Sequence, residues 1–295
     1  MTYSIVARDG DTGELGVAVQ SHWFAVGPIV PWARPGVGAI ATQANIEVSY
    51  GPRALELLQA GQAAPEALAR LLSEDPGAAG RQVAVVDGAG RVAVHTGSGC
   101  IPLAGHATDN GVSCQANMMA AEEVWPAMLD AFTAGGGPLT GRLLDALDAA
   151  ETAGGDVRGR QSAAILVVPA AGDWWETVTA LHVEDHPDPL AELRRLVELD
   201  GAYTLAGEAD ELVSHGRHDD AARLYRRASE LAPGSPELRF WAGLGAAQAG
   251  ELERGVADVR EAIAMHAGWR TLLERLPADV APSAAVVLAR LGADG

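Results

Sequence analysis

The sequence predicts an α+β domain, in which two antiparallel sheets pack face to face with helices outside, followed by a smaller all-α region. Apolar, β-branched segments occur in pairs around turn sequences, as the strands of hairpins do. Paired helical segments fall between them, so the order is strands, two helices, strands, two helices, strands. Because hairpins outnumber crossovers, this order excludes a parallel doubly wound sheet.

Eight segments are predicted to form strands, and several of them are paired around a turn. "YSIVAR" and "LGVAVQ" flank the turn "DGDTGE", and two similar segments within 82–97 flank Asp87-Gly88. The other predicted strands are 36–44, 111–118, 161–170 and 175–183.

Four helices separate these strands. The segments 51–60 and 64–73 each carry a proline early in the helix, where its missing N–H costs nothing. The segments 120–133 and 139–153 carry apolar residues at helical spacing.

The all-α region contains an internal repeat. Residues 216–234 align with 250–268 at a shift of 34, which is the tetratricopeptide period. The first copy has the small, large and proline positions of that repeat, and the second copy is degenerate; these positions are Ala221, Tyr225, Ala228 and Pro233.

Composition limits the function classes. The 295 residues carry 21 basic and 39 acidic side chains, a formal charge of −18, which makes nucleic acid and anionic membranes poor partners. No apolar run approaches the roughly 18 residues of a membrane span, and the N-terminus lacks the pattern of a signal peptide. With only two cysteines, Cys100 and Cys114, the expected location is a reducing cytoplasm.

The chain contains no lysine, so all of its 21 basic residues are arginines. This composition excludes Schiff-base chemistry and the lysine of phosphate-binding loops. Because arginine stays protonated, any proton abstraction must use another group.

Thr2 is the candidate nucleophile. If the preceding Met is removed, Thr2 carries a hydroxyl and a free α-amine, whose ordinary pKa of about 7.7–8.0 suits a general base. The competing interpretation is that Thr2 only begins a β-strand.

Several polar residues stand at predicted strand ends. "GGDVRGRQSAA" (154–164) places Asp156, Arg160, Gln161 and Ser162 before a strand, as a binding site or as a solvated glycine-rich loop. The other candidates are substrate or oxyanion donors, or sheet-end hydrogen-bonding groups: Ser21, Gln43 and Asn117. His182 and His186 flank acidic residues and would lie one turn apart on a helix, but the strand predicted at 175–183 argues against a helix, so we predict no metal site.

Five stretches resemble the family of domains of unknown function DUF1028. They are the first 44 residues, "SYGPRALELLQAG", "CIPLAGHATDNGVSCQANMM", "GGDVRGRQSAAILVV" and "DHPDPLAELRRL". The resemblance covers roughly residues 1–197 and leaves 198–295 as a helical domain similar to tetratricopeptide repeats. It implies the four-layer αββα sandwich of N-terminal-nucleophile hydrolases, in which Thr2 matches the nucleophile position.

The resemblance therefore implies an amide-bond hydrolase that acts on a small amide or peptide-like substrate without a cofactor. Arg34, Arg158 or Arg160 would supply the positive field that a lysine gives in proteasome-like members. The alternative is a non-catalytic module that binds a small metabolite on a degenerate hydrolase fold, with the helical tail recruiting a protein. The oligomeric state stays open, a homo-oligomer included.

Overall fold

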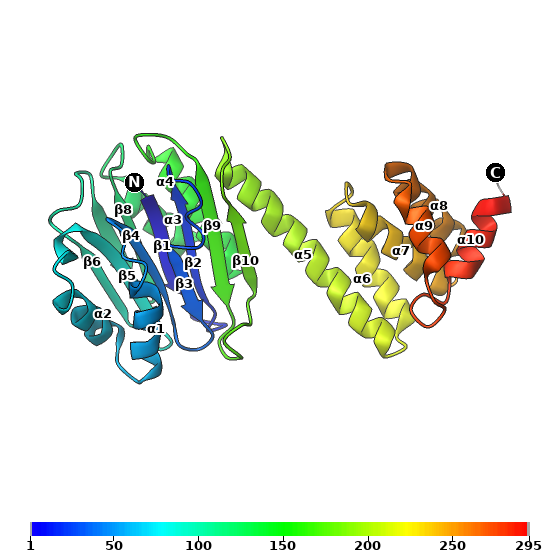
Figure 1. Ribbon diagram of the computed structural model, residues 1–295, viewed down its shortest axis with the longest axis horizontal. Coiled ribbons are helices and arrows are strands. Elements are labelled where there is room, and N and C mark those ends of the chain that lie inside the picture. Colours follow the sequence, from blue (N-terminus) through cyan, green and yellow to red (C-terminus); the bar gives the residue numbers. More distant parts are fainter. Residues whose placement is uncertain (1, 294–295) are drawn as a thin grey trace. The chain divides into compact units, whose positions relative to one another are not determined.

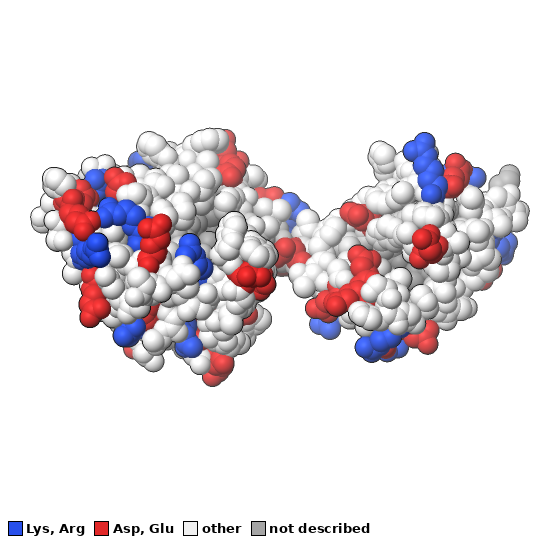
Figure 2. Space-filling view, turned by 60° about the horizontal axis from the view of Figure 1, so that its bottom comes forward, with Lys and Arg blue, Asp and Glu red and all other residues white. Residues whose placement is uncertain are grey.

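The computed structural model describes residues 2–293, which divide into two compact units, residues 2–195 and 196–293 (Figure 1). Within the described residues, no helix combines the length and the apolar character that a membrane span requires. Acidic side chains and arginines are interspersed on the face of the molecule shown in Figure 2.

Two antiparallel sheets form the first unit. The six-stranded sheet has the order β10-β9-β2-β1-β8-β7, and the four-stranded sheet has the order β3-β4-β5-β6. The strands are β1 (Thr2–Arg8), β2 (Leu15–Ser21), β3 (Pro31–Arg34), β4 (Gly38–Ala44), β5 (Arg81–Asp87), β6 (Val92–Thr96), β7 (Gly105–Asp109), β8 (Val112–Asn117), β9 (Ser162–Val168) and β10 (Thr179–Val183).

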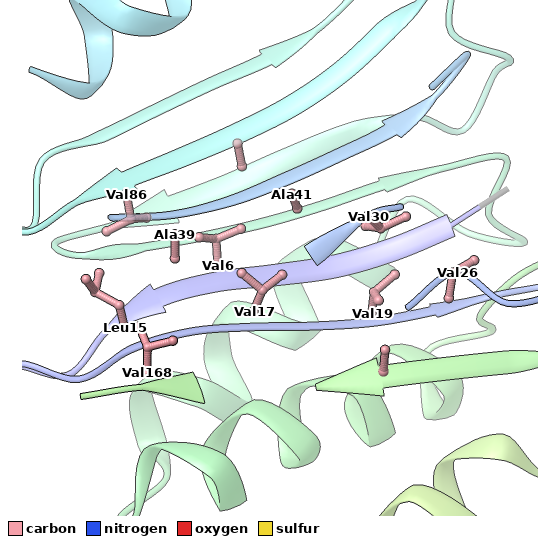
Figure 3. Close-up of a cluster of buried hydrophobic side chains, with 12 residues drawn as sticks. Val6, Leu15, Val17, Val19, Val26, Val30, Ala39, Ala41, Val86 and Val168 are labelled. Atoms are coloured by element: carbon pink, nitrogen blue, oxygen red, sulfur yellow. The ribbon is translucent and has the colours of Figure 1, made fainter. Parts of the chain in front are cut away.

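The sheets pack face to face. Val6, Val17 and Val19 of the six-stranded sheet share one buried cluster with Ala41 and Val86 of the other sheet (Figure 3). Since side chains alternate along a strand, Thr2 and Ser4 lie on the same inner face as Val6.

Helices cover the two outer faces (Figure 1). α1 (Tyr50–Gln59) and α2 (Ala64–Ser73) pack on the four-stranded sheet, and α3 (Val124–Ala134) and α4 (Leu139–Thr152) pack on the six-stranded sheet. A Cβ at Gly16 of β2 would lie 2.6 Å from the end of the Leu143 side chain of α4, so a larger residue at this position would displace Leu143. A mixed α and β unit with two antiparallel sheets is therefore confirmed.

Two strands were not predicted. β3 begins with a proline and has four residues, and β7 has five residues that are mostly exposed. Both lie at the edge of a sheet, where short, polar or proline-containing segments are tolerated and alternating hydrophobicity is weak. The predicted strand at 175–183 begins only at Thr179.

The second unit is helical, and α5 continues into it from the first unit. The helices are α5 (Pro189–Ser214), α6 (His218–Leu231), α7 (Pro236–Gln248), α8 (Leu252–Met265), α9 (Gly268–Arg275) and α10 (Ala284–Ala293). α6 and α8 are both 14 residues long and begin 34 positions apart, at the spacing of the sequence repeat.

Candidate functional site

Thr2 begins β1, a central strand of the six-stranded sheet. It pairs with Ser21 of β2 on one side and with Asn117 of β8 on the other. Only 7% of Thr2 is exposed, and its side chain lies on the inner face of the sheet. The strand order therefore places a hydroxyl at the point where β1 enters the sheet between β2 and β8.

The side chains around Thr2 fix both of its oxygen atoms. Its hydroxyl oxygen lies 3.0 Å from the hydroxyl oxygen of Ser21, which is fully buried. Its carbonyl oxygen accepts hydrogen bonds from Gln43 Nε2 at 3.3 Å and from Asn117 Nδ2 at 3.4 Å. Because Gln43 belongs to the four-stranded sheet, Thr2 is held by side chains from both sheets.

A buried network of amides continues beneath Thr2. Gln82 Oε1 accepts from Gln43 Nε2 at 2.8 Å and from Asn117 Nδ2 at 2.9 Å. Ser4 donates to Gln43 at 2.7 Å and accepts from Gln115 Nε2 at 2.6 Å. Each group thereby meets the requirement that buried polar atoms find partners. Sequence reasoning missed Gln82, although a glutamine opening an apolar strand was the available signal.

Asp156 occupies the space beyond the start of β1. Its Oδ2 accepts the N–H of His22, which follows Ser21, at 3.2 Å, and its backbone bridges to Met119, two residues after Asn117. The carboxylate is fully buried and pairs with the guanidinium of Arg158 at 3.3 Å. The extensions of both strands that flank β1 therefore hold this carboxylate beside the end of β1.

The other predicted residues of the 154–164 stretch have different partners. Ser162 donates to the carbonyl of Trp23 at 2.6 Å, and the N–H of Gln161 donates to the carbonyl of Ser21 at 3.2 Å. Both contacts fasten the chain that follows β2. Gln161 Nε2 also donates to Asp185 at 3.1 Å.

Arg160 pairs with surface acids, not with Asp156. Its guanidinium lies 2.9 Å from Asp188 and 3.7 Å from Glu151. Glu151 also accepts a hydrogen bond from the hydroxyl of Tyr3 at 2.6 Å, and burial, with a further contribution from Glu151, raises the pKa of Tyr3 well above its usual range.

Arg34 lies at the opposite end of its strand pair from Gln43. Of the three arginines considered from sequence, Arg158 is therefore the one beside Asp156.

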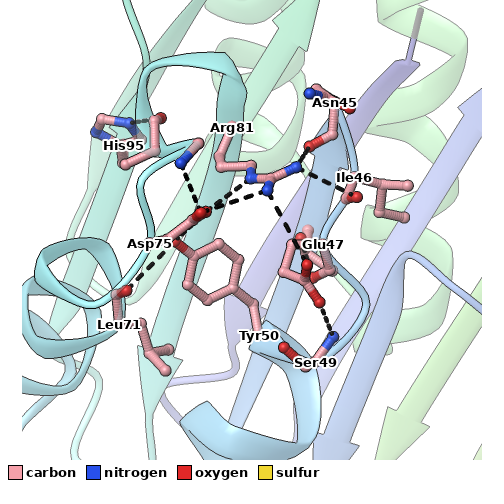
Figure 4. Close-up of polar contacts among 12 residues, drawn as sticks. Asn45, Ile46, Glu47, Ser49, Tyr50, Leu71, Asp75, Arg81 and His95 are labelled. Atoms are coloured by element: carbon pink, nitrogen blue, oxygen red, sulfur yellow. Dashed lines mark hydrogen bonds and ion pairs between the residues drawn. The ribbon is translucent and has the colours of Figure 1, made fainter.

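The loop that follows Gln43 is clamped by Arg81 (Figure 4). Arg81 donates to the carbonyl of Asn45 at 2.6 Å and to the carboxylate of Asp75 at 2.7 Å. Hydrogen bonds from Arg81 and from the backbone of Gly77 lower the pKa of Asp75 to about 2. Burial, together with a hydrogen bond to Asp75, raises the pKa of Tyr50 to about 12. The clamp therefore stays ionised at neutral pH and holds the chain beside the site.

Four non-glycine residues of the described chain have left-handed backbone conformations. Their φ angles lie between 53° and 69°, and the residues are Ala25, Ala44, Leu103 and Met118. Ala44 follows Gln43 and Met118 follows Asn117, while Ala25 and Leu103 lie in the loops after β2 and before β7. All four loops leave the sheets at the end of the strands where Thr2 lies. We call this end the Thr2 edge, and the other end of the strands the opposite edge. Such strain costs of order 1–3 kcal/mol per residue and concentrates at functional sites.

The two histidines considered as metal ligands have different partners. His182 lies on β10 and pairs with Glu184 at 3.7 Å, whereas the ring of His186 accepts the N–H of Asp188 at 3.0 Å. Within residues 2–293, no group of three His, Cys, Asp or Glu side chains is arranged to hold a metal ion.

Comparison with known proteins gives a family but no activity. The sequence matches a family of unknown function, DUF1028, over residues 2–193. The crystal structure of a Silicibacter pomeroyi protein of that family is similar, with a TM-score of 0.62 and 33% identity, over 67% of this chain and 88% of the other. No curated protein matches.

Proposed function

Because the chain belongs to the DUF1028 family, whose function is unknown, we propose a function from its own site: hydrolysis of an amide bond by an N-terminal threonine. The bond that precedes Thr2 would first be cleaved, leaving the Thr2 α-amine free. The observation that carries the proposal is the placement of Thr2 at the end of a central strand, with Ser21 on its hydroxyl and Asp156 just beyond its backbone.

The architecture supports the same proposal. Two face-to-face antiparallel sheets with helices outside are the arrangement of N-terminal-nucleophile hydrolases, which the sequence resemblance also implies. Four strained residues at the Thr2 edge agree with a working site, because such strain persists where the fold over-determines it.

The proposed reaction uses one residue as nucleophile and base. The neutral α-amine of Thr2 accepts the proton of its own hydroxyl, directly or through water, as the hydroxyl oxygen attacks the amide carbon. The resulting ammonium returns the proton to the leaving nitrogen when the carbon–nitrogen bond breaks, which leaves an ester on Thr2. Water then attacks the ester, the amine takes a proton from it, and the Thr2 hydroxyl leaves with that proton. The products are a carboxylic acid and an amine.

We assign positioning roles to the neighbouring side chains. Ser21 orients the Thr2 hydroxyl, and Asp156 orients the α-ammonium, while Arg158 offsets part of the carboxylate charge. The amide hydrogens of Gln43 and Asn117 point to the Thr2 carbonyl and to Gln82. We therefore revise their expected role from oxyanion donors to supports of the Thr2 backbone.

The experiment compares Thr2→Ala and Thr2→Ser with wild type in a screen of small primary amides, read out as ammonia release. Thr2→Ser keeps a hydroxyl and should retain measurable hydrolysis, whereas Thr2→Ala should abolish it. Thr133→Ala, which removes an exposed threonine hydroxyl from α3, is the matched control. Hydrolysis that survives in Thr2→Ala would overturn the proposal.

A second candidate is a non-catalytic module that binds a small metabolite, with the helical unit recruiting a protein. One observation favours it: the Gln43 and Asn117 amides are engaged within the protein, which leaves fewer side-chain donors for a transition state. The 34-residue offset of α6 and α8, and a cavity of about 450 Å³ lined in part by Tyr225 and Trp241, support a tetratricopeptide-like binding role for the second unit. Ligand binding by a chain that retains the residue before Thr2 would favour this candidate.

A further inference from the structure

Large apolar side chains gather in the loops at the Thr2 edge. Trp23 and Phe24, just after β2, are 60% and 62% exposed, and Val157 is 66% exposed. Ile101 and Leu103, before β7, are also exposed. We call these five residues the apolar rim. Exposed apolar side chains that gather in one region of a soluble protein mark a binding surface.

Hydrogen bonds join the rim segments into one continuous border. The segment of Trp23 meets Asp156 through the N–H of His22 at 3.2 Å, and Val157 follows Asp156. The N–H of Val157 donates to the carbonyl of Met118 at 3.5 Å. The next residue, Met119, donates to the carbonyl of Leu103 at 3.1 Å. The border therefore runs from the end of β2, past Asp156, to the end of β8, which are the two strands that flank Thr2.

The rim is held in place on both sides. Ser162 is buried, and its hydroxyl donates to the Trp23 carbonyl at 2.6 Å and accepts the N–H of Val26 at 3.4 Å. Ala25 and Leu103 have left-handed backbones, at φ 53° and 57°. Ordered loops with exposed apolar side chains provide a binding surface at a low cost in conformational entropy.

We propose that the apolar rim is the substrate-recognition surface of the Thr2 site, and that the substrate is a neutral amide with an alkyl or aromatic group. This inference rests on the proposed function and adds the substrate class. A group that covers the rim lies against the end of β1, where the reacting carbon must be. Asp156 and Arg158, which flank the rim residue Val157 in sequence, form an ion pair, so together they add no net charge beside the rim.

The test measures kcat/KM for ammonia release from unbranched primary amides, from acetamide to octanamide. Each added methylene that contacts the rim should raise kcat/KM by about fourfold, the value for burying one CH₂ group. In the double variant Trp23→Ser, Phe24→Ser this dependence on chain length should largely disappear.

The matched control is Trp174→Ser, Trp175→Ser. These residues form another exposed aromatic pair, 72% and 61% accessible, in the loop after β9 at the opposite edge of the same sheet. The control should keep the chain-length dependence of wild type. Equal dependence in the rim variant and wild type, or no dependence in wild type, would overturn the proposal.

Two further measurements test binding to the apolar rim independently of amide hydrolysis. If wild type hydrolyses no amide, the proposed function fails, and calorimetry with octanamide and acetamide still tests the rim. Tighter binding of octanamide that weakens in the Trp23, Phe24 variant supports the rim, and equal binding of the two amides overturns it. Light scattering tests the other occupant: a dimer that dissociates in the rim variant would show that a second copy covers the rim.

Discussion

The two edges of the paired sheets differ in how their loops turn. At the edge opposite Thr2, the left-handed residues are glycines: Gly13, Gly36, Gly90 and Gly111 join consecutive strands. At the Thr2 edge, Ala25, Ala44, Leu103 and Met118 adopt the same conformation with side chains that make it costly. One edge thus turns with little strain, while the other keeps strain beside a buried hydroxyl and a buried carboxylate.

Polar groups follow the same division. At the opposite edge, Asp9 and Asp87 accept backbone N–H groups of their own turns, as stabilising turn residues do, and Asp87 also accepts the N–H at the start of α2. At the Thr2 edge, Asp156 accepts one N–H of its own turn, from Arg158, and one from His22, far away in sequence, while amides from two sheets hold one carbonyl. The comparison places stabilising turns at one end of the strands and the proposed site at the other, so changes at the two ends should have different consequences.

The largest expected effect is on activity at the Thr2 edge. Thr2→Ala should lower kcat/KM by at least about 10³-fold, because it removes the attacking oxygen. Its free energy of unfolding should change much less, since Ser21 loses only one small hydroxyl partner. Steady-state kinetics and urea unfolding of the same sample measure the two effects. A variant with a much lower free energy of unfolding and an unchanged kcat/KM would contradict the comparison.

The second prediction concerns pH. The proposed base is an α-amine with an ordinary pKa of about 7.7–8.0, and only its neutral form accepts the hydroxyl proton. Below that pKa, kcat/KM should fall about tenfold per pH unit, and above it the profile should level. A pH profile of kcat/KM checks this slope, and a flat profile through the neutral range would show that another group is the base.

The third prediction tests stability at the opposite edge. Burial alone would raise the pKa of Asp87, but hydrogen bonds from Ala64, Arg91 and Ala89 outweigh it and hold the pKa below its usual value. Asp87→Asn should therefore lower the free energy of unfolding by about 1–3 kcal/mol at neutral pH, with little change in kcat/KM.

The pH dependence of this effect has a defined sign. A depressed folded-state pKa stabilises the protein above the unfolded value of about 3.9, and the stabilisation is lost as the pH falls through the folded-state pKa. The difference between wild type and Asp87→Asn should shrink over that acidic range in urea unfolding. Asp109→Asn, at an exposed position of the β7–β8 hairpin, is the control and should stay within about 0.5 kcal/mol of wild type.

The smallest expected effects come from exchanging the two kinds of turn. Gly90→Ala forces a side chain into a left-handed residue at φ 82° and should destabilise the protein by about 1–2 kcal/mol. Ala44→Gly relieves the same strain but adds freedom to the unfolded chain, so the free energy of unfolding should rise by less than about 1 kcal/mol. Thermal unfolding measures both, and equal destabilisation by both variants would remove the distinction between the edges.

Much of the first unit could be predicted from its sequence. The hairpins around Gly13 and Gly90, and the helix that begins at Ala64, combine local turn or capping signals with strong periodicity. β3 and β7 escaped prediction because edge strands need little hydrophobic alternation.

The candidate site was predictable only in part. Thr2, Ser21, Gln43 and Asn117 carry local signals, namely polar residues at ends of apolar strands, and the structure brings them together. The strand register decides their partners, and register depends on pairings distant in sequence. For that reason the role of Gln82, the pairing of Arg160 with Asp188 and the place of Asp156 between two strand extensions required the structure.

The central claim is that Thr2 acts as an N-terminal residue. Mass spectrometry of the N-terminal peptide, on protein whose amide hydrolysis has been measured in the same preparation, tests it most directly. The account predicts that active protein begins at Thr2, with a free α-amine. Hydrolysis by protein in which every molecule keeps the residue before Thr2 would contradict it, because a peptide nitrogen cannot accept the hydroxyl proton.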